Sequence, residues 1–411
     1  MVFVYNIAIR FYYSIIVLLS PFNKKAKLWL DGRKDWANEL ESSISPNYPT
    51  AWFHCASLGE FEQGRPLIEA YRENHPGHRI LLTFFSPSGY EIRKNYSGAD
   101  YVCYLPLDTP RNAKLFLSIA KPVIAIFVKY EFWYHFIKQL HKNKTPIYVV
   151  SAIFRPKQIF FRWYGRWYRK VLYRFNHIFV QNSQSVTLLQ SVGISNATVA
   201  GDTRFDRVFA AAERAEEIPL LEEFSENSLV IVAGSTWPKD DELLLDYIRT
   251  APKGVKFIIA PHEIDRSKIA RFIDATNLPA VRYTGPEGVN IYDTQVLVLD
   301  TIGILAAAYR YGDIAYIGGG FGVGIHNTLE PATYGIPIVF GPNHGKFNEA
   351  KELIKEGAAF SISNSNELIS VFNNLVNNTE TRNSAGTAAK EFVLDNIGAT
   401  DRILGELRPK K

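Results

Sequence analysis

The chain of 411 residues is long enough for two or three domains, each with its own core. A content of 47% hydrophobic and 21% charged residues is typical of a folded protein and excludes wholesale disorder. The net charge of +5 is too small to indicate nucleic-acid binding by itself. Two cysteines are too few for a disulfide scaffold, and no spacing of cysteine, histidine or aspartate is typical of a metal site. We therefore expect neither a metal ion nor a cofactor.

The N-terminus is a candidate membrane segment. Residues 1–22 are mostly apolar and are followed by three lysines, with no acidic residue before Asp31. The uninterrupted apolar run, residues 11–19, is shorter than the ~20 residues of a spanning helix, and no small-residue cleavage site follows it. We predict an uncleaved membrane-associating segment over residues 1–30, which either spans the bilayer or lies in its interface and keeps the rest of the chain on the cytoplasmic face. A core helix of the first domain is the alternative.

From residue 50 onward, short β-rich runs alternate with longer helical segments. Because the runs are apolar at successive positions, they are typical of parallel strands that helices cover on both faces. In the first half they are residues 52–57, 79–85, 101–107, 123–130, 147–152, 177–181 and 197–201, and in the second half residues 229–233, 256–260, 295–299, 314–317, 337–340 and 358–363.

An acidic, alanine-rich stretch after Arg207 separates the two series of strands. The pattern predicts an α/β protein of two doubly wound, Rossmann-like units that face a cleft, with ligands at the carboxyl ends of the strands. We expect the first domain at residues 31–208 and the second at residues 209–386. A final helix and basic tail, residues 387–411, would return to pack on the first domain.

The most glycine-rich segment follows the predicted strand 314–317. Five glycines lie within residues 318–324, so main-chain N–H groups near Gly320 could approach an anion. The segment continues into Asn327, Thr328, Leu329 and Glu330. Glu330 could accept hydrogen bonds from a ribose diol, although a tight turn and a helix cap would explain the same residues.

Two other strand ends of the second half carry polar residues. Ser235 and Thr236 follow strand 229–233, and His262 and Glu263 follow strand 256–260. Their side chains are expected to reach the cleft. Helix capping explains the first pair equally well, and a solvated histidine explains the second.

Three charged residues follow strands of the first half. Glu60 begins a helix after strand 52–57, Glu131 lies among aromatic residues after strand 123–130, and Arg204 follows strand 197–201. Glu60 is a candidate base, although a carboxylate at a helix start is often only a cap. An acid among aromatics usually has a function or a partner.

Residues 155–174 contain seven basic residues, seven aromatic residues and no acid. Aromatic residues at positions 160, 163, 164 and 167 follow helical spacing, and this predicts a basic amphipathic helix. Its candidate membrane-contacting residues are Arg162, Trp163, Arg166, Trp167, Arg169 and Lys170. We expect it to bind an anionic lipid surface rather than nucleic acid, with core packing and a solvated face as the alternative.

The order of these motifs resembles the 3-deoxy-D-manno-octulosonic acid (Kdo) transferases of lipopolysaccharide assembly. The resemblance runs from the hydrophobic N-terminus through ASLGEFEQGRP around Glu60, the aromatic run at Glu131, GDTRFDR, AGST and DTIG to HNTLEPATYGIPIVFGP. It implies a metal-independent, inverting glycosyltransferase of the GT-B fold. Such an enzyme moves Kdo from CMP-Kdo to a lipid A precursor, lipid IVA, at the cytoplasmic face of the bacterial inner membrane.

The resemblance also implies roles for single residues. Glu60 resembles the general base, and Glu131 and Arg204 resemble groups that stabilise the transition state. Contacts with CMP would be made by His262, Glu263, Ile302, Gly303, Ile304 and Asn327 to Glu330, besides the loop residues Ser235, Thr236 and Gly320. At His262, Glu263 and Ile304 the chain departs from the family pattern, so only main-chain contacts are expected there.

Two other classes of function stay open on the sequence. One is a GT-B enzyme that uses a UDP-sugar, either a transferase or an epimerase. The other is a non-catalytic, membrane-tethered module that binds nucleotides or anionic lipids. Thermal stabilisation of the protein by CMP but not by UMP or UDP would separate the Kdo transferase hypothesis from these two alternatives.

Overall fold

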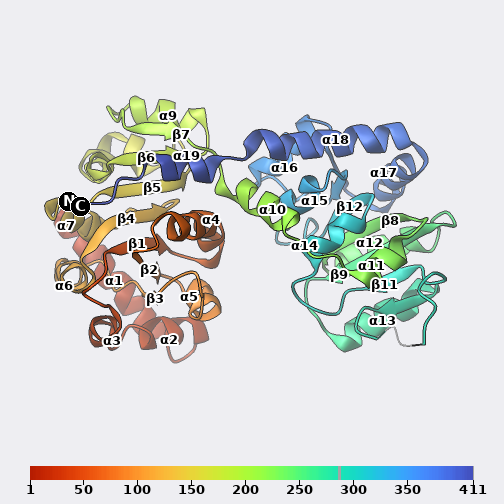
Figure 1. Ribbon diagram of the computed structural model, residues 1–411, viewed down its shortest axis with the longest axis horizontal. Helices are drawn as coiled ribbons and strands as arrows, with labels where there is room; N and C mark the ends of the chain where they lie inside the picture. Colours follow the sequence, from red (N-terminus) through yellow and green to blue (C-terminus); the bar gives the residue numbers. More distant parts are fainter. Residues whose placement is uncertain (286–287, 411) are drawn as a thin grey trace. The chain divides into compact units, whose positions relative to one another are not determined.

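The computed structural model describes residues 1–285 and 288–410, which form two compact units. The first unit contains Met1–Arg207 and the chain from Ile397 onward, and the second contains Val208–Asn396. Each unit is a parallel sheet with helices on both faces (Figure 1). The predicted α/β class with two doubly wound units is therefore confirmed. The expected basic tail ends at residue 411, which lies outside the described residues.

Within the described residues of the first unit, the sheet has the strand order β3-β2-β1-β4-β5-β6-β7. The strands are β1 (Thr50–Cys55), β2 (Arg79–Phe84), β3 (Tyr101–Tyr104), β4 (Pro122–Val128), β5 (Ile147–Ala152), β6 (His177–Val180) and β7 (Ala197–Val199). The helices are α1 (Val2–Leu19), α2 (Lys24–Asp31), α3 (Trp36–Ser43), α4 (Leu58–Asn74), α5 (Pro87–Arg93), α6 (Pro110–Ala120), α7 (Tyr134–Lys142), α8 (Arg166–Arg169), α9 (Ser183–Gln190) and α19 (Ala399–Glu406). The helix α10 (Thr203–Glu213) begins in the first unit and continues into the second after Arg207.

Alternate residues of the central strands feed two cores, one on each face of this sheet. On β1, Trp52 packs with residues of α6 and α7, whereas Phe53 packs with residues of α4 and α19. All six residues of β1 are buried. A strand buried on both faces has no polar alternation, which is why the apolar runs of the sequence locate these strands.

Within the described residues of the second unit, the sheet has the strand order β10-β11-β9-β8-β12-β13-β14. The strands are β8 (Leu229–Thr236), β9 (Val255–Pro261), β10 (Ala280–Arg282), β11 (Val296–Val298), β12 (Ile314–Ile317), β13 (Ile338–Phe340) and β14 (Ala359–Ser361). The helices are α11 (Pro219–Ser225), α12 (Pro238–Ile248), α13 (Arg266–Thr276), α14 (Leu305–Ala308), α15 (Leu329–Thr333), α16 (Asn348–Lys355), α17 (Ser365–Asn377) and α18 (Thr379–Asn396).

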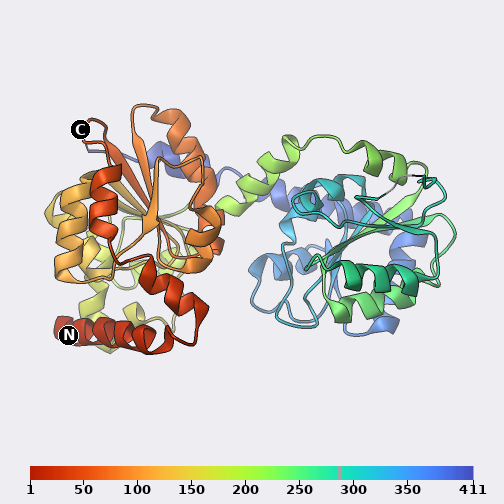
Figure 2. The same cartoon turned by 90° about the horizontal axis from the view of Figure 1, so that it is seen from below.

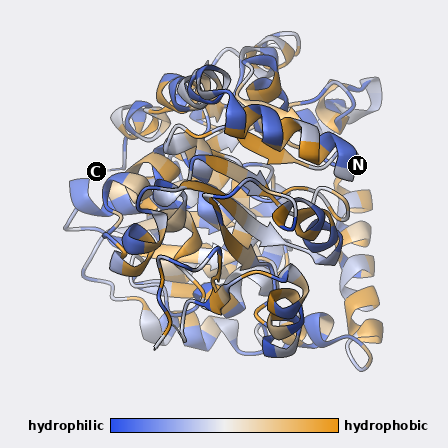
Figure 3. Ribbon diagram, turned by 90° about the vertical axis from the view of Figure 1, so that its right-hand side faces the viewer, coloured by the Kyte–Doolittle hydropathy of each residue, from blue (hydrophilic) through white to orange (hydrophobic). Residues whose placement is uncertain are grey.

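The strands of this sheet are also hydrophobic between more hydrophilic helices and loops (Figure 3). The sequence analysis missed β10, which has three residues, of which only Val281 is buried. A short edge strand has no apolar run that would distinguish it from a loop.

The predicted amphipathic helix over residues 155–174 is wrong. The structure has three short 3₁₀ turns, Ile159–Phe161, Trp163–Gly165 and Leu172–Arg174, around the single turn α8. Gly165 packs so tightly that a Cβ there would lie 1.7 Å from the carbonyl oxygen of Ile159. Tertiary packing breaks the helical register that the aromatic spacing suggested.

The breaks also separate the aromatic residues that were expected on one stripe. Phe160 is buried in the core, whereas Trp163 is 89% exposed. Arg162, Arg166 and Lys170 are exposed, but Trp167 and Arg169 are half-buried, and Arg169 donates to the carbonyl of Phe160.

The boundary expected at residue 386 differs from the structure. Residue 387 lies inside the continuous helix α18, and the chain leaves the second unit only after Asn396. It then forms α19, whose Ile403 packs into the core beside α4. The polar composition and the weak apolar pattern of α18 gave no local sign that the helix starts before residue 387.

Candidate active site

Glu60 lies at the start of α4, directly after the carboxyl end of β1. Its Oε2 atom accepts hydrogen bonds from the main-chain N–H groups of Ala56 (2.6 Å) and Ser57 (3.2 Å). Burial and the nearby charge of Glu131 raise the pKa of the Glu60 carboxyl to about 8, while the main-chain donors and Lys129 act in the opposite direction. A carboxyl with this pKa can exchange a proton near neutral pH, as a general base must.

Glu131 follows β4 and lies beside a buried histidine. Its side chain is 12% exposed, and its Oε2 atom is 3.4 Å from Nε2 of His54. The indole N–H of Trp133 donates to the same nitrogen (3.0 Å), and Nδ1 of His54 is 2.8 Å from Oγ1 of Thr83. Because an indole nitrogen can only donate, Nε2 of His54 accepts and the ring proton lies on Nδ1, toward Thr83. This cluster holds in place the loop that carries Glu131.

Arg204 lies at the start of α10 and is held by Asp202. Its Nε and Nη2 atoms donate to Oδ2 of Asp202 at 2.9 and 2.7 Å. Gln63 of α4 also donates to Asp202, and the Thr203 hydroxyl donates to the main-chain carbonyl of Gln63. The network ties the start of α10 to the first turns of α4, which begins with Glu60. Since Glu60, Glu131 and Arg204 follow parallel strands of one sheet, all three lie at its carboxyl edge.

Three of the seven non-glycine residues with a positive φ in the described chain lie at or near the carboxyl ends of strands. Lys129 after β4, Ser151 near the end of β5 and Ser235 near the end of β8 have φ values of 69°, 54° and 56°. Non-glycine residues in this region cost about 1 to 3 kcal/mol each, and such residues cluster at functional sites.

In the second unit, Asp240 joins two loops at the carboxyl edge of the sheet. Its buried Oδ2 accepts from the main-chain N–H groups of Trp237 (2.9 Å) and Gly319 (2.8 Å), and Oδ1 accepts from the hydroxyl of Tyr316 (2.7 Å). Trp237 precedes α12, and Gly319 belongs to the glycine-rich loop after β12. The sequence analysis did not single out Asp240.

The glycine-rich loop is closely packed against its neighbours. A Cβ at Gly318 would lie 2.2 Å from the carbonyl oxygen of Ser235, and a Cβ at Gly320 would lie 2.6 Å from Cα of Gly341. Close main-chain approach therefore requires glycine at both positions, in agreement with the tight-turn explanation. A ligand contact at Gly320 stays a prediction.

Three aromatic rings stack beside this loop. The ring centroids of Trp237 and His262 are 4.4 Å apart, and those of His262 and His326 are 4.7 Å apart. The indole N–H of Trp237 donates to Nε2 of His326 (3.1 Å). Burial and the neighbouring His262 lower the pKa of His326. The sequence analysis did not single out Trp237, although a tryptophan between a strand and a helix was a visible signal.

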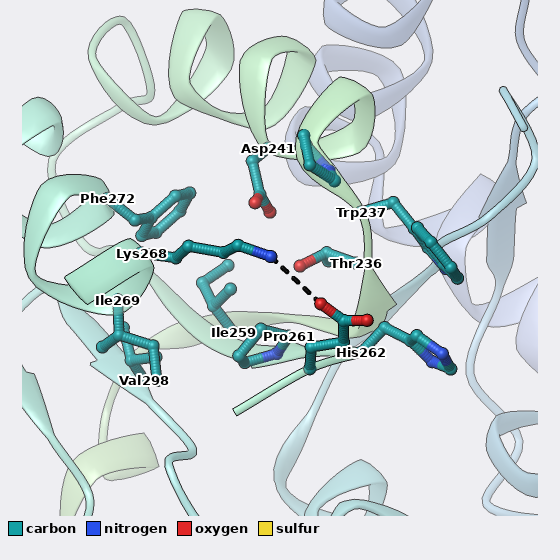
Figure 4. Close-up of a pocket in the computed structure, with 12 residues that line it drawn as sticks. Thr236, Trp237, Asp241, Ile259, Pro261, His262, Lys268, Ile269, Phe272 and Val298 are labelled. Carbon is teal, nitrogen blue, oxygen red and sulfur yellow. Dashed lines mark hydrogen bonds and ion pairs between the residues drawn. The ribbon is translucent and has the colours of Figure 1, made fainter. Parts of the chain in front are cut away.

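A cavity of about 160 Å³ adjoins this stack (Figure 4). Lys268 reaches along the cavity and forms an ion pair with Glu263 (3.0 Å), and Asp241 and Thr236 lie at the same opening. Burial raises the pKa of Asp241 to about 6, although the hydroxyl of Thr236 lowers it. The cavity is lined by Thr236, Trp237, Pro238, Asp241, Ile259, Pro261, His262, Glu263, Lys268, Ile269, Phe272 and Val298. It thus combines an apolar floor with a polar rim.

The other predicted donor-site residues lie at neighbouring strand ends. Ile302 is 88% exposed, Gly303 has a φ of 100°, and Ile304 precedes α14. These three follow β11, which pairs with β9, the strand that ends before His262. The structure therefore places both groups at one edge of the second sheet.

The segment from Asn327 to Glu330 has a capping geometry. The Asn327 side chain accepts from the N–H of Leu329 (3.0 Å) and donates to Oε1 of Glu330 (2.9 Å). Thr328 and Leu329 are buried. Only Asn327 and Glu330 of this segment present side chains to solvent, and their contact with a ribose stays a prediction.

Within residues 1–285 and 288–410, no cluster of three or more histidine, cysteine, aspartate or glutamate side chains has a geometry that could hold a metal ion.

Comparison with known proteins decides the family. The sequence model of a family described as 3-deoxy-D-manno-octulosonic-acid transferase (kdotransferase) matches residues 31–207. A 3-deoxy-D-manno-octulosonic acid transferase of Aquifex aeolicus is 32% identical over 334 residues, which cover 79% of this chain and 85% of the relative. The chain belongs to the Kdo transferase family. A Kdo transferase of Rickettsia bellii is 28% identical over 370 residues, 86% of each chain. The resemblance seen in the motifs is confirmed, and this Kdo transferase family member is a glycosyltransferase.

Solved structures support the fold. The UDP-GlcNAc 2-epimerase of Neisseria meningitidis, bound to UDP-GlcNAc, superposes with a TM-score of 0.60 at 14% identity, covering 87% of this chain and 98% of its own. The HepE protein of Anabaena, in complex with UDP, has a TM-score of 0.52 at 14% identity, covering 87% of this chain and 98% of its own. At such low identity the likeness shows the shared GT-B fold alone.

Proposed function

We propose that this Kdo transferase moves Kdo from CMP-Kdo to a lipid A precursor, lipid IVA, with inversion and without a metal ion. The observation that carries the proposal is the position of the Glu60 carboxyl, which lies at the carboxyl end of β1, beside Glu131, and is held by the N–H groups of Ala56 and Ser57, in a chain of this family. In this proposal, the first unit binds the acceptor and the second binds the donor.

Glu60 acts as the base in one displacement step. A hydroxyl oxygen of the acceptor attacks the anomeric carbon of Kdo, and Glu60 takes the hydroxyl proton as the new C–O bond forms. The bond between that carbon and the phosphate oxygen of CMP breaks, and CMP leaves with the bonding electrons. Attack from the face opposite the leaving group inverts the anomeric carbon.

Glu131 and Arg204 support this step. Glu131 holds negative charge close to Glu60 and thereby raises its pKa. Arg204, oriented by two hydrogen bonds to Oδ2 of Asp202, supplies a fixed positive charge for the transition state.

The donor is bound at the carboxyl edge of the second sheet. Main-chain N–H groups of the glycine-rich loop bind the phosphate of CMP, and Glu330 binds the ribose diol. The remaining contacts are made by Ser235, Thr236, His262, Glu263, Ile302, Gly303, Ile304, Gly320, Asn327, Thr328 and Leu329, in part through main-chain atoms.

The acceptor is a lipid, so the reaction takes place at a membrane. The helix α1 has 18 residues and is apolar enough to cross a bilayer by length and composition. We place the enzyme on an anionic membrane surface at the cytoplasmic face, with the lysines after α1 toward the lipid headgroups.

Mass spectrometry of the product from CMP-Kdo and a tetraacylated lipid A precursor tests the reaction. We expect the mass of one or more Kdo residues to be added, and EDTA to leave the rate unchanged. Thermal stabilisation by CMP but not by UMP separates this donor from a UDP-sugar. An unmodified acceptor, a rate abolished by EDTA, or stabilisation by UMP alone would each contradict the corresponding part of the proposal.

A further inference from the structure

We infer that α1 does not span the membrane but lies flat in the interface of an anionic bilayer, because its inner face is bound to the first unit near both of its ends. The inference rests on the membrane association proposed above and decides between spanning and lying in the plane. Figure 2 shows α1, in red next to the label N, running along the margin of the first unit.

The outer face of α1 is apolar and exposed. We define this face as Phe3, Ile7, Phe11, Ile15 and Leu18, whose exposed fractions are 74%, 50%, 66%, 38% and 73%. At 3.6 residues per turn these five positions fall within an arc of about 120°. The helix therefore presents a mostly hydrophobic stripe away from the protein, which includes the polar Ser14 and is bordered by Arg10.

The opposite face is bound to the first unit near the N-terminus of the helix. The hydroxyl of Tyr5 donates to Oδ2 of Asp108 (2.5 Å), and the side chain of Asn6 is 2.6 Å from Nε2 of His135. Asp108 is buried and also accepts from the main-chain N–H of His135. Burial raises the pKa of Asp108 to about 6, and the Tyr5 hydrogen bond lowers it. These polar contacts are specific to a docked helix.

The same face is bound again near the C-terminal end of the helix. The ring of Tyr12 stacks on Phe85 at 6.0 Å and meets the edge of Trp29 at 5.9 Å. Ile16 is only 9% exposed. The helix thus has contacts with one unit at both ends of its inner face.

These contacts fix the direction of the helix. Tyr5 and Ile16 are eleven residues apart, which is about 16 Å of helix. A helix that crossed the hydrocarbon would carry the attached part of the first unit into it, including the buried carboxyl of Asp108 and the ring of His135. Ionisable groups at that depth of the bilayer cost several kcal/mol. Only a helix in the plane of the interface keeps these contacts and buries the outer face.

The charges around α1 fit an anionic lipid surface. No acidic residue occurs in residues 1–30 or 132–201, whereas Arg10 and Arg166 are exposed. The ring of Tyr5 lies 6.2 Å from that of Trp167, so the segment with the exposed Trp163 adjoins α1. Each cation near an anionic surface contributes about 1 kcal/mol, in addition to the burial of the apolar stripe.

Spin-label depth in vesicles of phosphatidylethanolamine and phosphatidylglycerol tests the orientation. A nitroxide is attached to one cysteine introduced at position 3, 11 or 18 of the full chain with Cys103→Ala, in which the remaining Cys55 is fully buried. The depth of the nitroxide is measured from its accessibility to oxygen and to a water-soluble nickel complex. The inference predicts equal depths at the three positions. A spanning helix predicts a difference of about 12 Å between positions 3 and 11, because eight residues separate them. That difference would overturn the inference, as would three labels that stay in water.

Co-sedimentation with the same vesicles tests the stripe itself. Phe3, Phe11 and Leu18 replaced together by glutamine should weaken binding at least tenfold, while the matched variant Ile92→Gln, an exposed apolar residue on α5, should bind like the wild type. Wild-type binding by the triple variant would refute the inference. Neither experiment uses CMP-Kdo, so a negative result would contradict the orientation of α1 and not the proposed reaction. An unmodified acceptor in the mass-spectrometry experiment would contradict the proposed reaction and not the orientation of α1.

Discussion

The pH dependence of Kdo transfer tests Glu60 as the base, and Glu131→Gln is the most informative perturbation. Burial and the charge of Glu131 raise the pKa of Glu60 to about 8. With this pKa, about a tenth of Glu60 is ionised at pH 7, about half at pH 8 and about nine tenths at pH 9. If the ionised form is the base, kcat/KM should rise about fivefold from pH 7 to 8 and level off above pH 9.

Glu131→Gln removes a like charge but keeps the size of the side chain. A like charge disfavours ionisation, so its loss must lower the pKa of Glu60. Burial, the larger cause, remains, so the pKa should stay above its usual value of 4.5. The pH range over which kcat/KM rises should therefore move to lower pH, even if kcat/KM of the variant is lower than that of the wild type at every pH.

The assay measures kcat/KM for the lipid acceptor at saturating CMP-Kdo between pH 6 and 9.5. Glu69→Gln is a matched control, because Glu69 lies on the same helix but pairs with Arg65 on its surface. Its profile should match the wild type. A wild-type profile that is flat over this range, or a rise of kcat/KM over an unchanged pH range in Glu131→Gln, would refute the reasoning.

Three further predictions concern stability and donor binding. Because folding raises the pKa of Glu60 from 4.5 to about 8, the contribution of Glu60 to the free energy of unfolding is complete below pH 4.5 and is lost as the pH rises to about 8. Glu60→Gln should therefore become more stable than the wild type between pH 5 and 9, by less than the roughly 5 kcal/mol of a fully buried group. Chemical denaturation that shows no such gain would contradict this prediction. Asp240→Asn should lower the affinity for CMP about tenfold in calorimetry, because the charge-assisted hydrogen bonds of Asp240 to both loops are lost. Tyr316→Phe removes only the donor to Oδ1 of Asp240, so it should lower the free energy of unfolding by about 1 kcal/mol and keep the affinity for CMP. Equal effects of the two variants on CMP affinity would show that Asp240 does not position the two loops for CMP. Glu330→Ala should weaken CMP binding by about 1.5 to 3 kcal/mol, and wild-type affinity in the folded variant would show that Glu330 does not bind the ribose.

The prediction of strands succeeded where burial is complete. The predicted bounds 147–152 and 314–317 coincide with β5 and β12. Most residues of such strands are apolar because helices cover both faces, although Ser151 in β5 is polar, so a local pattern is sufficient. The edge strand β10 has no such cover and gave no pattern.

The candidate site could be predicted only in part. Glu60, Glu131 and Arg204 were found because each follows a strand whose end was visible in the sequence. The contacts between distant residues were not found. The indole of Trp133 donates to His54, 79 residues earlier, and the N–H of Gly319 donates to Asp240, also 79 residues earlier. No local signal indicates which side chain of a neighbouring strand will supply a hydrogen bond.

The sequence by itself determined the α/β class, the two series of strands and the family, because hydrophobic periodicity and contiguous motifs are local properties of the chain. Only the tertiary structure decided that residues 155–174 are broken into short turns, that Asp240 joins two loops, and that α1 is fastened along the first unit. Each of these depends on contacts between segments distant in sequence, such as Tyr5 with Asp108. Packing between distant segments overrides local helical spacing because buried contacts and satisfied polar groups contribute more free energy than helix propensity does.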